Sequence, residues 1–470
     1  MTKNLFLKPL IDFPDSIIED ATTGNSYTYA EFYELFQPVA ANLLNAGIMR
    51  NSIVVIFGFK NAFDTLKLFY ACLQNHLIPF IVEAGSFDST KDLAYAGIFM
   101  PTKITAQSAD LSISFSLHEE IEINFYLKKS DHLFIGNDND FLVISSSGST
   151  STITKKILLG ALQTKQNIEA NQKALEITEA DITLIILPIS YSYGLIAQFL
   201  SHLFAGATIV LGDRMLGILQ LSKLLSKYHI TTLFLTPLLS RLLLYYNQKL
   251  NTIPNNLRFL TLGGDKPMVG IVAKIEKLFA TQIYGTYGLA EAGPRVATNK
   301  KITAANGVFK YAIGESNPGI WTYITECSNY SLLQNRTGVG YLSICSPSIY
   351  IGYIQGNKIT YAESSTHLKT KDIAYEEDGQ IYILGRENDY FESKSGIVWF
   401  YQIAEQLYNN PTVLKIKIVK EINNALNIKI YHRNCASNKE LTNILKTSFD
   451  LNAGADYTLD FIEFSNNHYK

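Results

Sequence analysis

The sequence predicts an α/β protein with a large N-terminal domain of helix-covered, mostly parallel sheets, a β-rich subdomain and a small mobile α+β C-terminal domain. Two observations lead to this prediction. Apolar strands alternate with amphipathic helices along the first half of the chain, which is typical of parallel sheets covered on both faces. The 470 residues also exceed what one hydrophobic core usually holds, and 47% of them are hydrophobic.

The N-terminal elements begin with a capping box. Thr28 and Glu31 start a helix that is expected to end near Gly47, and Pro38 inside it predicts a kink or a split. The elements expected next are a strand at 53–57, a helix at about 62–74 and a strand at 78–82. This order of strand, helix and strand predicts parallel pairing.

The same alternation continues beyond an apolar strand expected at 141–144. It comprises a helix near 163–175, strands at 182–187, 208–211 and 231–235, and helices at about 195–204 and 216–227. No charged residue occurs between Asp181 and Asp213, a length that could cross a membrane. Pro188, Gly194 and Gly206 interrupt this stretch, which favours buried strands and a helix over a transmembrane segment.

The sequence pattern changes after residue 307. Up to Tyr353, short runs of strand-forming residues alternate with glycines, which predicts a subsidiary β-barrel or sheet. We place the large domain at 1–385, its β-rich subdomain at about 307–385, and the small lid domain at 386–470. The elements expected in the small domain are helices near 402–408 and 439–448 and strands at 413–419 and 425–431.

Composition excludes some partner classes. The net charge of −2 provides no electrostatic footprint for nucleic acid. Four scattered cysteines without a CxxC pair argue against a structural zinc site and for a reducing, cytoplasmic compartment. The first residues contain lysines but no long apolar segment, so no signal peptide is expected.

A hydroxyl-rich stretch follows the strand at 141–144. It contains Ser146, Ser147, Gly148, Ser149 and Thr150, and the basic pair Lys155 and Lys156 closes it. Hydroxyls, exposed backbone N–H groups and a positive charge can cradle a polyphosphate. A flexible Ser/Thr linker is the alternative reading. The stretch is not a GxxxxGK[ST] phosphate loop, because no Gly-Lys pair follows Gly148.

Six segments in order resemble the adenylate-forming superfamily of acyl- and aryl-CoA synthetases, stand-alone adenylation enzymes and luciferases. These segments are TYAEFYELFQPVAANLLNAGI, ISSSGSTSTITKKI, LPISYSYGL, LRFLTLGGDKPM, YGTYGLAEAGPRVAT and LKTKDIAYEEDGQIYILGREND. The second is similar to the family's phosphate loop, the fifth to its YGxTE segment, and the last to its TGD and GRxxD pair. The resemblance covers nearly the whole chain.

The resemblance implies roles at the phosphate end of ATP. Ser146 to Thr150 and Lys155 would hold the β- and γ-phosphates, and whether Lys155 or Lys156 points inward stays open. Glu291 matches the acidic residue that carries Mg²⁺, a cation that prefers oxygen ligands. Ala290 replaces the family's threonine, so one hydroxyl contact to the adenylate phosphate is missing.

The resemblance also implies a nucleoside site. Gly263, Gly264 and Asp265 would form the adenine-side turn, where glycine permits a close backbone approach. Tyr287 and Gly288 belong to the same nucleotide-binding set. Asp372 would accept hydrogen bonds from the ribose hydroxyls, and Arg386 would add a second ribose or phosphate contact.

The acid site lacks the aspartate that binds the α-ammonium group in amino-acid-activating relatives. No carboxylate occurs between Leu187 and Gly194, and a buried ammonium without a counter-charge is unfavourable. A fatty, aryl or other non-amino acid is therefore expected. Tyr191 lies where relatives often carry histidine, so it either gates the acid pocket or serves as a core aromatic.

The C-terminal domain departs from the family pattern. Asn388 occupies the hinge position where Asp or Lys is usual, and Glu392 replaces a lysine of the thiol-tunnel loop. The candidate for the family's adenylation lysine is Lys470, which lacks the usual Pro and Gly before it. A lysine at a chain terminus is more often disordered than catalytic.

The resemblance implies ATP-dependent activation of a non-amino organic acid as an acyl-adenylate, with Mg²⁺. Transfer to a thiol follows, from coenzyme A or from the phosphopantetheine of an acyl carrier protein. The alternative is a catalytically impaired adenylate-binding or scaffold protein of the same fold, which Ala290, Asn388 and Glu392 favour.

Overall fold

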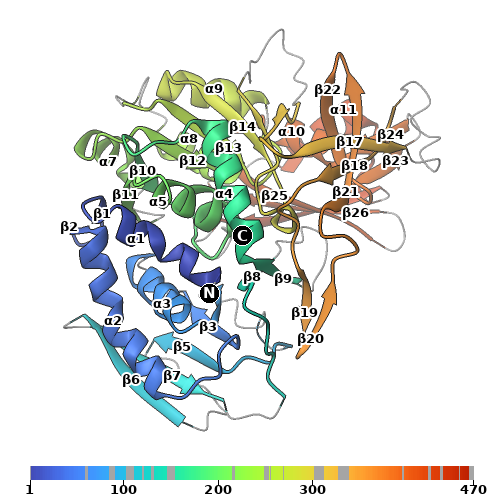
Figure 1. The fold of residues 1–470 in the computed structure, drawn as a ribbon. Coiled ribbons are helices and arrows are strands. Elements are labelled where there is room, and N and C mark those ends of the chain that lie inside the picture. The colour runs from blue at the N-terminus through green and yellow to red at the C-terminus, as the bar shows by residue number, and fades with distance from the viewer. Residues whose placement is uncertain are drawn as a thin grey trace.

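The computed structural model describes most of the chain (Figure 1). The described residues are 2–58, 62–83, 90, 92–101, 111–118, 121–128, 132–145, 154–213, 218–247, 253, 256–267, 269–300, 312–326, 338–393, 396–421, 425–433, 438–454 and 456–464. Two nine-stranded sheets, one four-stranded sheet, one three-stranded sheet and one two-stranded sheet form the framework of these residues.

The first large sheet has the strand order β16-β15-β14-β13-β12-β10-β11-β1-β2. Its strands are β1 (Ile17–Asp20), β2 (Asn25–Thr28), β10 (Ile182–Ile185), β11 (Thr208–Leu211), β12 (Thr232–Leu235), β13 (Phe259–Gly263), β14 (Ile283–Tyr287), β15 (Ala297–Asn299) and β16 (Glu315–Ser316). Pairing is parallel from β1 to β14, and β2, β15 and β16 add antiparallel edges. The carboxyl ends of β13 and β14 therefore lie side by side.

The second large sheet has the order β20-β19-β9-β8-β4-β3-β5-β7-β6. Its strands are β3 (Ile53–Phe57), β4 (Ile78–Val82), β5 (Gly97–Pro101), β6 (Leu111–His118), β7 (Ile121–Leu127), β8 (Asp140–Ser145), β9 (Lys156–Gly160), β19 (Gly352–Gln355) and β20 (Lys358–Tyr361). The centre is parallel and both flanks are antiparallel. Because β9 pairs with β19, the strand after the Ser/Thr stretch lies beside a segment almost 200 residues away in the sequence.

Helices cover these sheets (Figure 1). They are η1 (Thr2–Phe6), α1 (Lys8–Asp12), α2 (Tyr29–Asn45), α3 (Ala62–Gln74), α4 (Ala161–Leu175), η3 (Tyr193–Leu200), α5 (Ser201–Leu203), α7 (Leu221–Lys227), α8 (Pro237–Tyr246), α9 (Val269–Phe279) and the short η4 (Ala290–Ala292). The expected capping box is present, since Thr28 and Glu31 exchange hydrogen bonds at the start of α2. Pro38 does not split α2, which is one helix.

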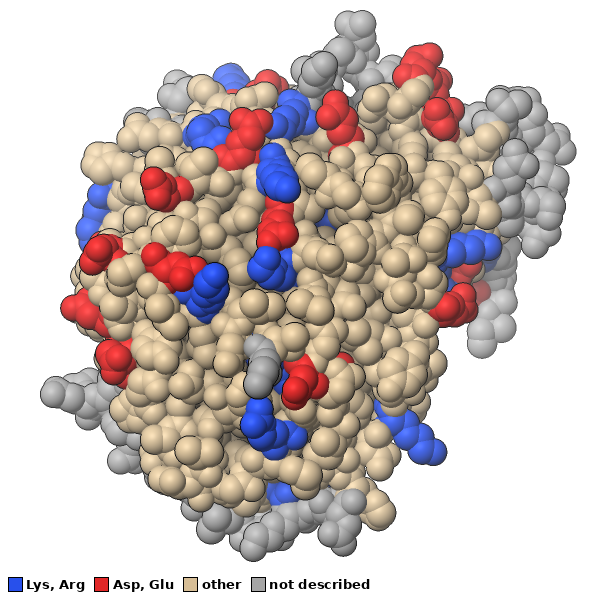
Figure 2. Space-filling view, viewed as in Figure 1, with Lys and Arg blue, Asp and Glu red and all other residues tan. Residues whose placement is uncertain are grey.

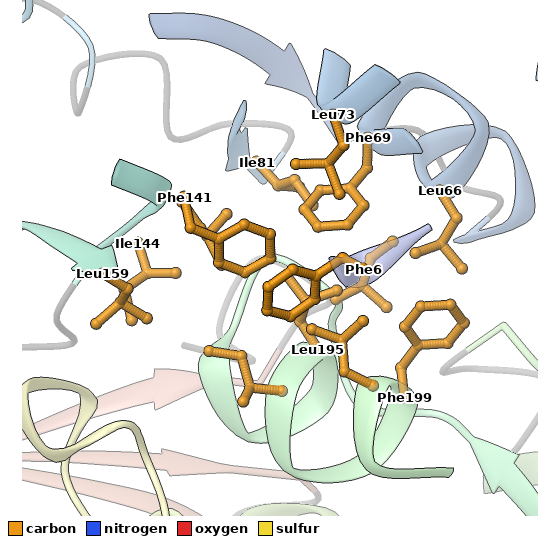
Figure 3. Close-up of a cluster of buried hydrophobic side chains, with 14 of the residues drawn as sticks. Phe6, Leu66, Phe69, Leu73, Ile81, Phe141, Ile144, Leu159, Leu195 and Phe199 are labelled. Carbon is orange, nitrogen blue, oxygen red and sulfur yellow. The ribbon is translucent and has the colours of Figure 1, made fainter. Parts of the chain in front are cut away.

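The largest core lies between the two sheets and their helices (Figure 3). Phe6 stacks on Phe141 of β8 with ring centroids 3.8 Å apart, and Phe199 of η3 and Phe69 of α3 close the cluster. The uncharged stretch that begins at Ile182 is thus buried inside the protein. None of the helices in the described ranges is long and apolar enough to cross a membrane.

The β-rich segment is divided among three sheets. Its four-stranded antiparallel sheet has the order β17-β18-β21-β22, formed by Trp321–Glu326, Gly340–Cys345, His367–Glu377 and Gln380–Arg386. The strands β16, β19 and β20 instead join the two large sheets. The prediction of β-rich structure in this segment is confirmed. The bounds of about 307–385 for a β-rich subdomain stay a prediction.

We refer to the described residues from Glu387 to Phe464 as the C-terminal unit. Its elements are β23 (Tyr390–Ser393), β24 (Gly396–Trp399), α10 (Phe400–Leu407), β25 (Val413–Lys420), β26 (Leu426–His432), α11 (Asn438–Phe449) and β27 (Tyr457–Glu463). Apolar residues of these elements form a core of their own, which includes Ile403, Ile428 and Leu445. The unit is α+β, as expected, and its strands β23, β24 and β27 were not predicted from the sequence.

Candidate functional site

A cluster forms around Glu291, which η4 carries just after β14. The Tyr353 hydroxyl on β19 donates to Glu291 Oε1 at 2.9 Å. Lys155 Nζ lies 4.6 Å from the centroid of the Tyr353 ring. Burial and then the Glu291 charge raise the pKa of Tyr353, so its phenol keeps its proton and remains a donor. We call Lys155, Tyr353 and Glu291 the Glu291 cluster.

Strand pairing explains how Lys155 reaches this cluster. In the register of β9 and β19, Ile157 pairs with Tyr353 and Lys156 with Ile354. Lys156 is 7% exposed, and burial lowers its pKa, whereas Lys155 is exposed at the Tyr353 side. Lys155 thus contacts the Tyr353 ring of the Glu291 cluster, and Lys156 is buried in the sheet. Which of the two lysines meets the phosphates stays a prediction.

A second cluster forms around Asp372 on β21. The Tyr287 hydroxyl donates to Asp372 Oδ2 at 2.6 Å, and Arg386 Nε lies 3.5 Å from Asp372 Oδ1. Asp372 and Arg386 are direct partners in the pairing of β21 with β22, so the fold itself brings them together. Asp372 is only 7% exposed. We call Tyr287, Asp372 and Arg386 the Asp372 cluster.

The two clusters share an electrostatic field. Burial lowers the pKa of Arg386, but the negative charges of Asp372, Asp389 and Glu291 outweigh it and leave the pKa raised. Burial and then Asp372 raise the pKa of Tyr287, which therefore stays a protonated donor. The charge of Glu291 thus contributes to the raised pKa of Arg386, and the short segment after β14 joins Tyr287 of the Asp372 cluster to Glu291.

The turn after β13 lies beside the end of β14, the strand that carries Tyr287 of the Asp372 cluster. Gly264 has φ +82°, a conformation that favours glycine, and its carbonyl accepts a hydrogen bond from Tyr191 Oη at 3.4 Å. A Cβ on Gly263 would lie 2.0 Å from Thr286 Oγ1. The Asp265 carboxylate accepts the backbone N–H of Lys266 at 2.7 Å. The turn therefore packs closely against Thr286 and Tyr191, and its residues Gly264 and Asp265 are exposed.

A buried polar clamp holds the segment that carries Glu291. Asn167 Nδ2 donates to the carbonyls of Ala292 and Arg295, and Asn167 Oδ1 accepts the Arg295 N–H at 3.0 Å. A Cβ on Gly288 would lie 1.7 Å from the Pro294 carbonyl oxygen, so the segment folds back on itself too tightly for any side chain there. The position of Glu291 is therefore fixed by α4 as well as by β14.

The structure brings together most of the predicted residues. The two clusters, the turn after β13 and the segments that join them contain Lys155, Tyr191, Gly263, Gly264, Asp265, Tyr287, Gly288, Ala290, Glu291, Asp372 and Arg386. Asn388 is exposed in the turn that follows Arg386. Ser146, Ser147, Gly148, Ser149, Thr150 and Lys470 lie outside the described residues.

Sequence reasoning missed Tyr353, Asn167 and Lys266. Tyr353 belongs to no motif, and only the long-range pairing of β9 with β19 places it beside Lys155. Asn167 is fully buried on α4, a helix whose pattern predicted its existence but not its polar contacts. An asparagine at a helix position that faces the core is the one signal that could have identified the clamp.

Charge and carboxylate distribution limit the chemistry. Within the described ranges, no group of three or more His, Cys, Asp or Glu residues could hold a metal ion on its own. On the face shown in Figure 2, acidic and basic side chains are interspersed among uncharged ones. Glu291, with Lys155 on the adjacent tyrosine ring, suits a metal that is bound mainly through the phosphates of a nucleotide.

The fold and these clusters define an adenylate-forming protein. A model of the AMP-binding enzyme family matches residues 116–354, about half of the chain, and the chain belongs to this family. Among curated relatives, 4-coumarate--CoA ligase 3 of Arabidopsis thaliana is 24% identical, over 88% of this chain and 78% of its own. 2-Succinylbenzoate--CoA ligase of Listeria innocua is 24% identical, over 78% of this chain and 74% of its own.

Solved structures share the fold. The o-succinylbenzoate CoA synthetase of Bacillus subtilis, in complex with its acyl-adenylate intermediate, has a TM-score of 0.75 at 17% identity. The alignment covers 98% of this chain and 94% of the synthetase. The complex of McyG with phenylalanyl-adenylate has a TM-score of 0.77 at 15% identity, over 98% of this chain and 79% of that one.

Proposed function

We propose that this protein activates a non-amino carboxylic acid with ATP and transfers the acyl group to a thiol. In the first step the carboxylate attacks the α-phosphorus of ATP, which gives an acyl-adenylate and releases pyrophosphate. In the second step the thiol sulfur attacks the acyl carbon, and AMP leaves. The observation that carries the proposal is the placement of Lys155, Glu291, Asp372 and Arg386 around one region, in a chain of the AMP-binding enzyme family.

The nucleoside half of ATP would be bound by the Asp372 cluster and the turn after β13. Tyr287 and Arg386 already orient both oxygens of Asp372, and each oxygen retains a lone pair that can accept a ribose hydroxyl. The exposed backbone at Gly264 and Asp265 would lie against adenine. Because the Asp372 carboxylate is already oriented before ATP binds, less conformational entropy is lost on binding.

The phosphates would be bound at the Glu291 cluster. Lys155 is the described cation on this side, and the hydroxyl-rich segment 146–150 leads directly to it in sequence. Glu291 has one oxygen bonded to Tyr353, so the other can ligate Mg²⁺. When bound, Mg²⁺ supplies neutralisation of the charge on the departing pyrophosphate. Ala290 offers no hydroxyl, so we expect slow adenylation.

The acid would lie between Tyr191 and the Glu291 cluster. The described residues Leu187 to Gly194 contain no carboxylate that could neutralise an α-ammonium group. The printed names of the curated relatives specify 4-coumarate and 2-succinylbenzoate, which lack that group. These observations support an aryl or other simple organic acid.

The thiol would be coenzyme A or a carrier-protein phosphopantetheine, and the names of the curated relatives favour coenzyme A. We propose that residues 386–470 act as a lid that reorients about Asn388 between the two steps. Its own core supports movement as one body. Lys470 is the candidate to contact the reacting phosphate during adenylation.

ATP–pyrophosphate exchange across aryl, fatty, dicarboxylic and α-amino acids tests the first step. We expect exchange with at least one non-amino acid and none with α-amino acids. Absence of exchange with every acid, while ATP still binds, would favour the impaired adenylate-binding protein. Offering coenzyme A and a phosphopantetheinylated carrier to the adenylate-loaded enzyme, and detecting which one is acylated by mass spectrometry, identifies the acceptor.

A further inference from the structure

Two cations of the preceding part of the chain contact the C-terminal unit. Arg241 lies on α8, and Lys266 follows β13 directly after Asp265. The rings that they cover, Tyr408 and Tyr401, are seven residues apart at the end and the start of α10. Seven residues are two helical turns, so both cations meet one face of this helix.

Arg241 is a buried charge that backbone carbonyls hold. It is 8% exposed, and its guanidinium carbon lies 4.1 Å from the centroid of the Tyr408 ring. Its Nη1 donates to Tyr408 O at 3.2 Å, and its Nη2 donates to Asn410 O at 3.4 Å and to Val413 O. No carboxylate within the described ranges forms an ion pair with it. The two Nη groups are therefore hydrogen-bonded in this orientation of the C-terminal unit, whereas the buried Nε has no partner among the described residues. A buried guanidinium that lost these acceptors would be strongly unfavourable.

The acceptors of Arg241 are themselves fixed. Tyr408 Oη accepts the N–H of Ile416 at 3.0 Å, and Asn410 Oδ1 accepts both the N–H and the hydroxyl of Thr412. Asn410 Nδ2 donates to Glu440 on α11 at 3.3 Å. The turn between α10 and β25 thus presents its carbonyls as a rigid receptor for one guanidinium.

Lys266 forms a contact nearer to the candidate site. Its Nζ donates to Ile383 O on β22 at 2.8 Å and lies 3.3 Å from the centroid of the Tyr401 ring. One residue earlier, Asp265 belongs to the turn proposed to meet adenine, and β22 ends at Arg386 of the Asp372 cluster. Lys266 therefore connects the candidate nucleotide site to the face of α10.

We propose that Arg241 and Lys266 are positioning residues that hold the C-terminal unit in the orientation seen here, and that Lys266 couples this orientation to the adjacent turn. The inference rests on the proposed two-step function for its effect on reaction rates. Apolar contacts at Leu414 and Phe464 also join the unit to the core around α8, so loss of one cation should leave both parts folded.

The orientation of the C-terminal unit relative to the preceding part of the chain is measured by pulsed electron spin resonance, as the distance between two spin labels. Spin labels are placed at Leu219 and Ser448, both exposed, in a variant whose Cys327, Cys345 and Cys435 are serine. We expect one main distance in the parent and a second population in Arg241→Met and in Lys266→Met. Each substitution removes hydrogen bonds from a charged donor. The population of molecules in the orientation seen here, relative to all other orientations, should therefore fall by about tenfold.

Arg258→Met is the matched control. Arg258 lies over the Phe259 ring and bonds to the Glu176 carbonyl and to Asp181, all outside the C-terminal unit. An unchanged distance distribution in both Arg241→Met and Lys266→Met, or an equal change in Arg258→Met, would overturn the proposal. Thermal unfolding confirms that each variant is folded.

The two half-reactions provide a kinetic readout. Loss of the held orientation should change the ratio of the pyrophosphate-exchange rate to the acyl-transfer rate by about tenfold in Arg241→Met, because only one half-reaction uses that orientation. Equal slowing of both would mean a merely structural role. If the parent shows no exchange with any acid, the proposed function fails, and the distance measurement still decides the positioning role.

Discussion

The Glu291 cluster and the Asp372 cluster each combine a carboxylate, a tyrosine and a cation, but they differ in how fully the carboxylate is engaged. Asp372 is buried, and both of its oxygens face partners, Tyr287 and Arg386. Glu291 is half-buried, with Tyr353 on one oxygen, and its cation Lys155 lies over the tyrosine ring instead of beside the carboxylate.

This difference separates recognition from chemistry. A carboxylate oriented on both sides offers fixed acceptors, which suits a ribose that stays in place through the reaction. A carboxylate engaged on one side can exchange ligands, which suits a metal and phosphates that arrive and leave. Changes at Glu291 should therefore alter turnover, and changes at Asp372 should alter the affinity for ATP.

Replacing Glu291 should have the largest effect. We expect Glu291→Ala to reduce the exchange rate by about a thousandfold, because the metal that neutralises pyrophosphate loses its one protein carboxylate. The apparent affinity for ATP without Mg²⁺ should change little. Glu376→Ala, which removes an exposed carboxylate on β21, is the control. An exchange rate in Glu291→Ala within twofold of the parent would disprove the assignment of this cluster.

Replacing Asp372 should have the next largest effect, and this effect should be on the binding of ATP. Asp372→Asn should raise the KM for ATP by about a hundredfold, because the amide cannot accept from both Tyr287 and the ribose at full strength and loses the pairing with Arg386. Isothermal titration with ATP measures the same loss. If kcat falls while the KM for ATP stays constant, the division between the two clusters is wrong.

Lys155 and Lys156 are adjacent in the sequence, and replacing each one in turn compares an exposed lysine with a buried one. Lys155→Met should slow exchange by about thirtyfold, because a cation near the phosphates is lost. Lys156→Met should keep the exchange rate and leave stability the same or higher, since burial already disfavours the charge on Lys156. Steady-state exchange and urea unfolding measure both variants. The reverse pattern would assign the phosphate contact to Lys156.

Tyr353→Phe should have the smallest effect. It removes the hydrogen bond to Glu291 Oε1 but keeps the ring under Lys155, so we expect a three- to tenfold loss of exchange rate, about the value of one such bond. A titration with Mg²⁺ should show a weaker apparent affinity for the metal, so that a higher Mg²⁺ concentration is needed, for the same reason. No change in either quantity would mean that Tyr353 does not orient Glu291.

The sequence was sufficient for features set by local pattern. The apolar runs at Ile53–Phe57 and Ile78–Val82, and the helix between them, occur at the expected residues because each has a continuous buried face or the right periodicity. The capping box at Thr28 and Glu31 is equally local. Ordered motifs also predicted the family and the two carboxylates of the candidate site.

Features set by distant pairing were not predictable. The pairing of β9 with β19, which brings Tyr353 to Lys155, joins segments that carry no mutual signal in a single sequence. No sequence pattern singled out Arg241 or Lys266, and only the packing of α10 shows which rings they contact. Pro38 lies within one continuous helix, so of the kink or split that a local rule predicted, the split is absent.

Transfer of labelled oxygen tests the central claim most directly. An acid that supports exchange is prepared with oxygen-18 in its carboxylate and is incubated with ATP, Mg²⁺ and the thiol acceptor, and the AMP is analysed by mass spectrometry. Attack of the carboxylate on the α-phosphorus predicts a single heavy oxygen in each AMP formed with thioester. Label in inorganic phosphate, or AMP without label, would contradict an acyl-adenylate route.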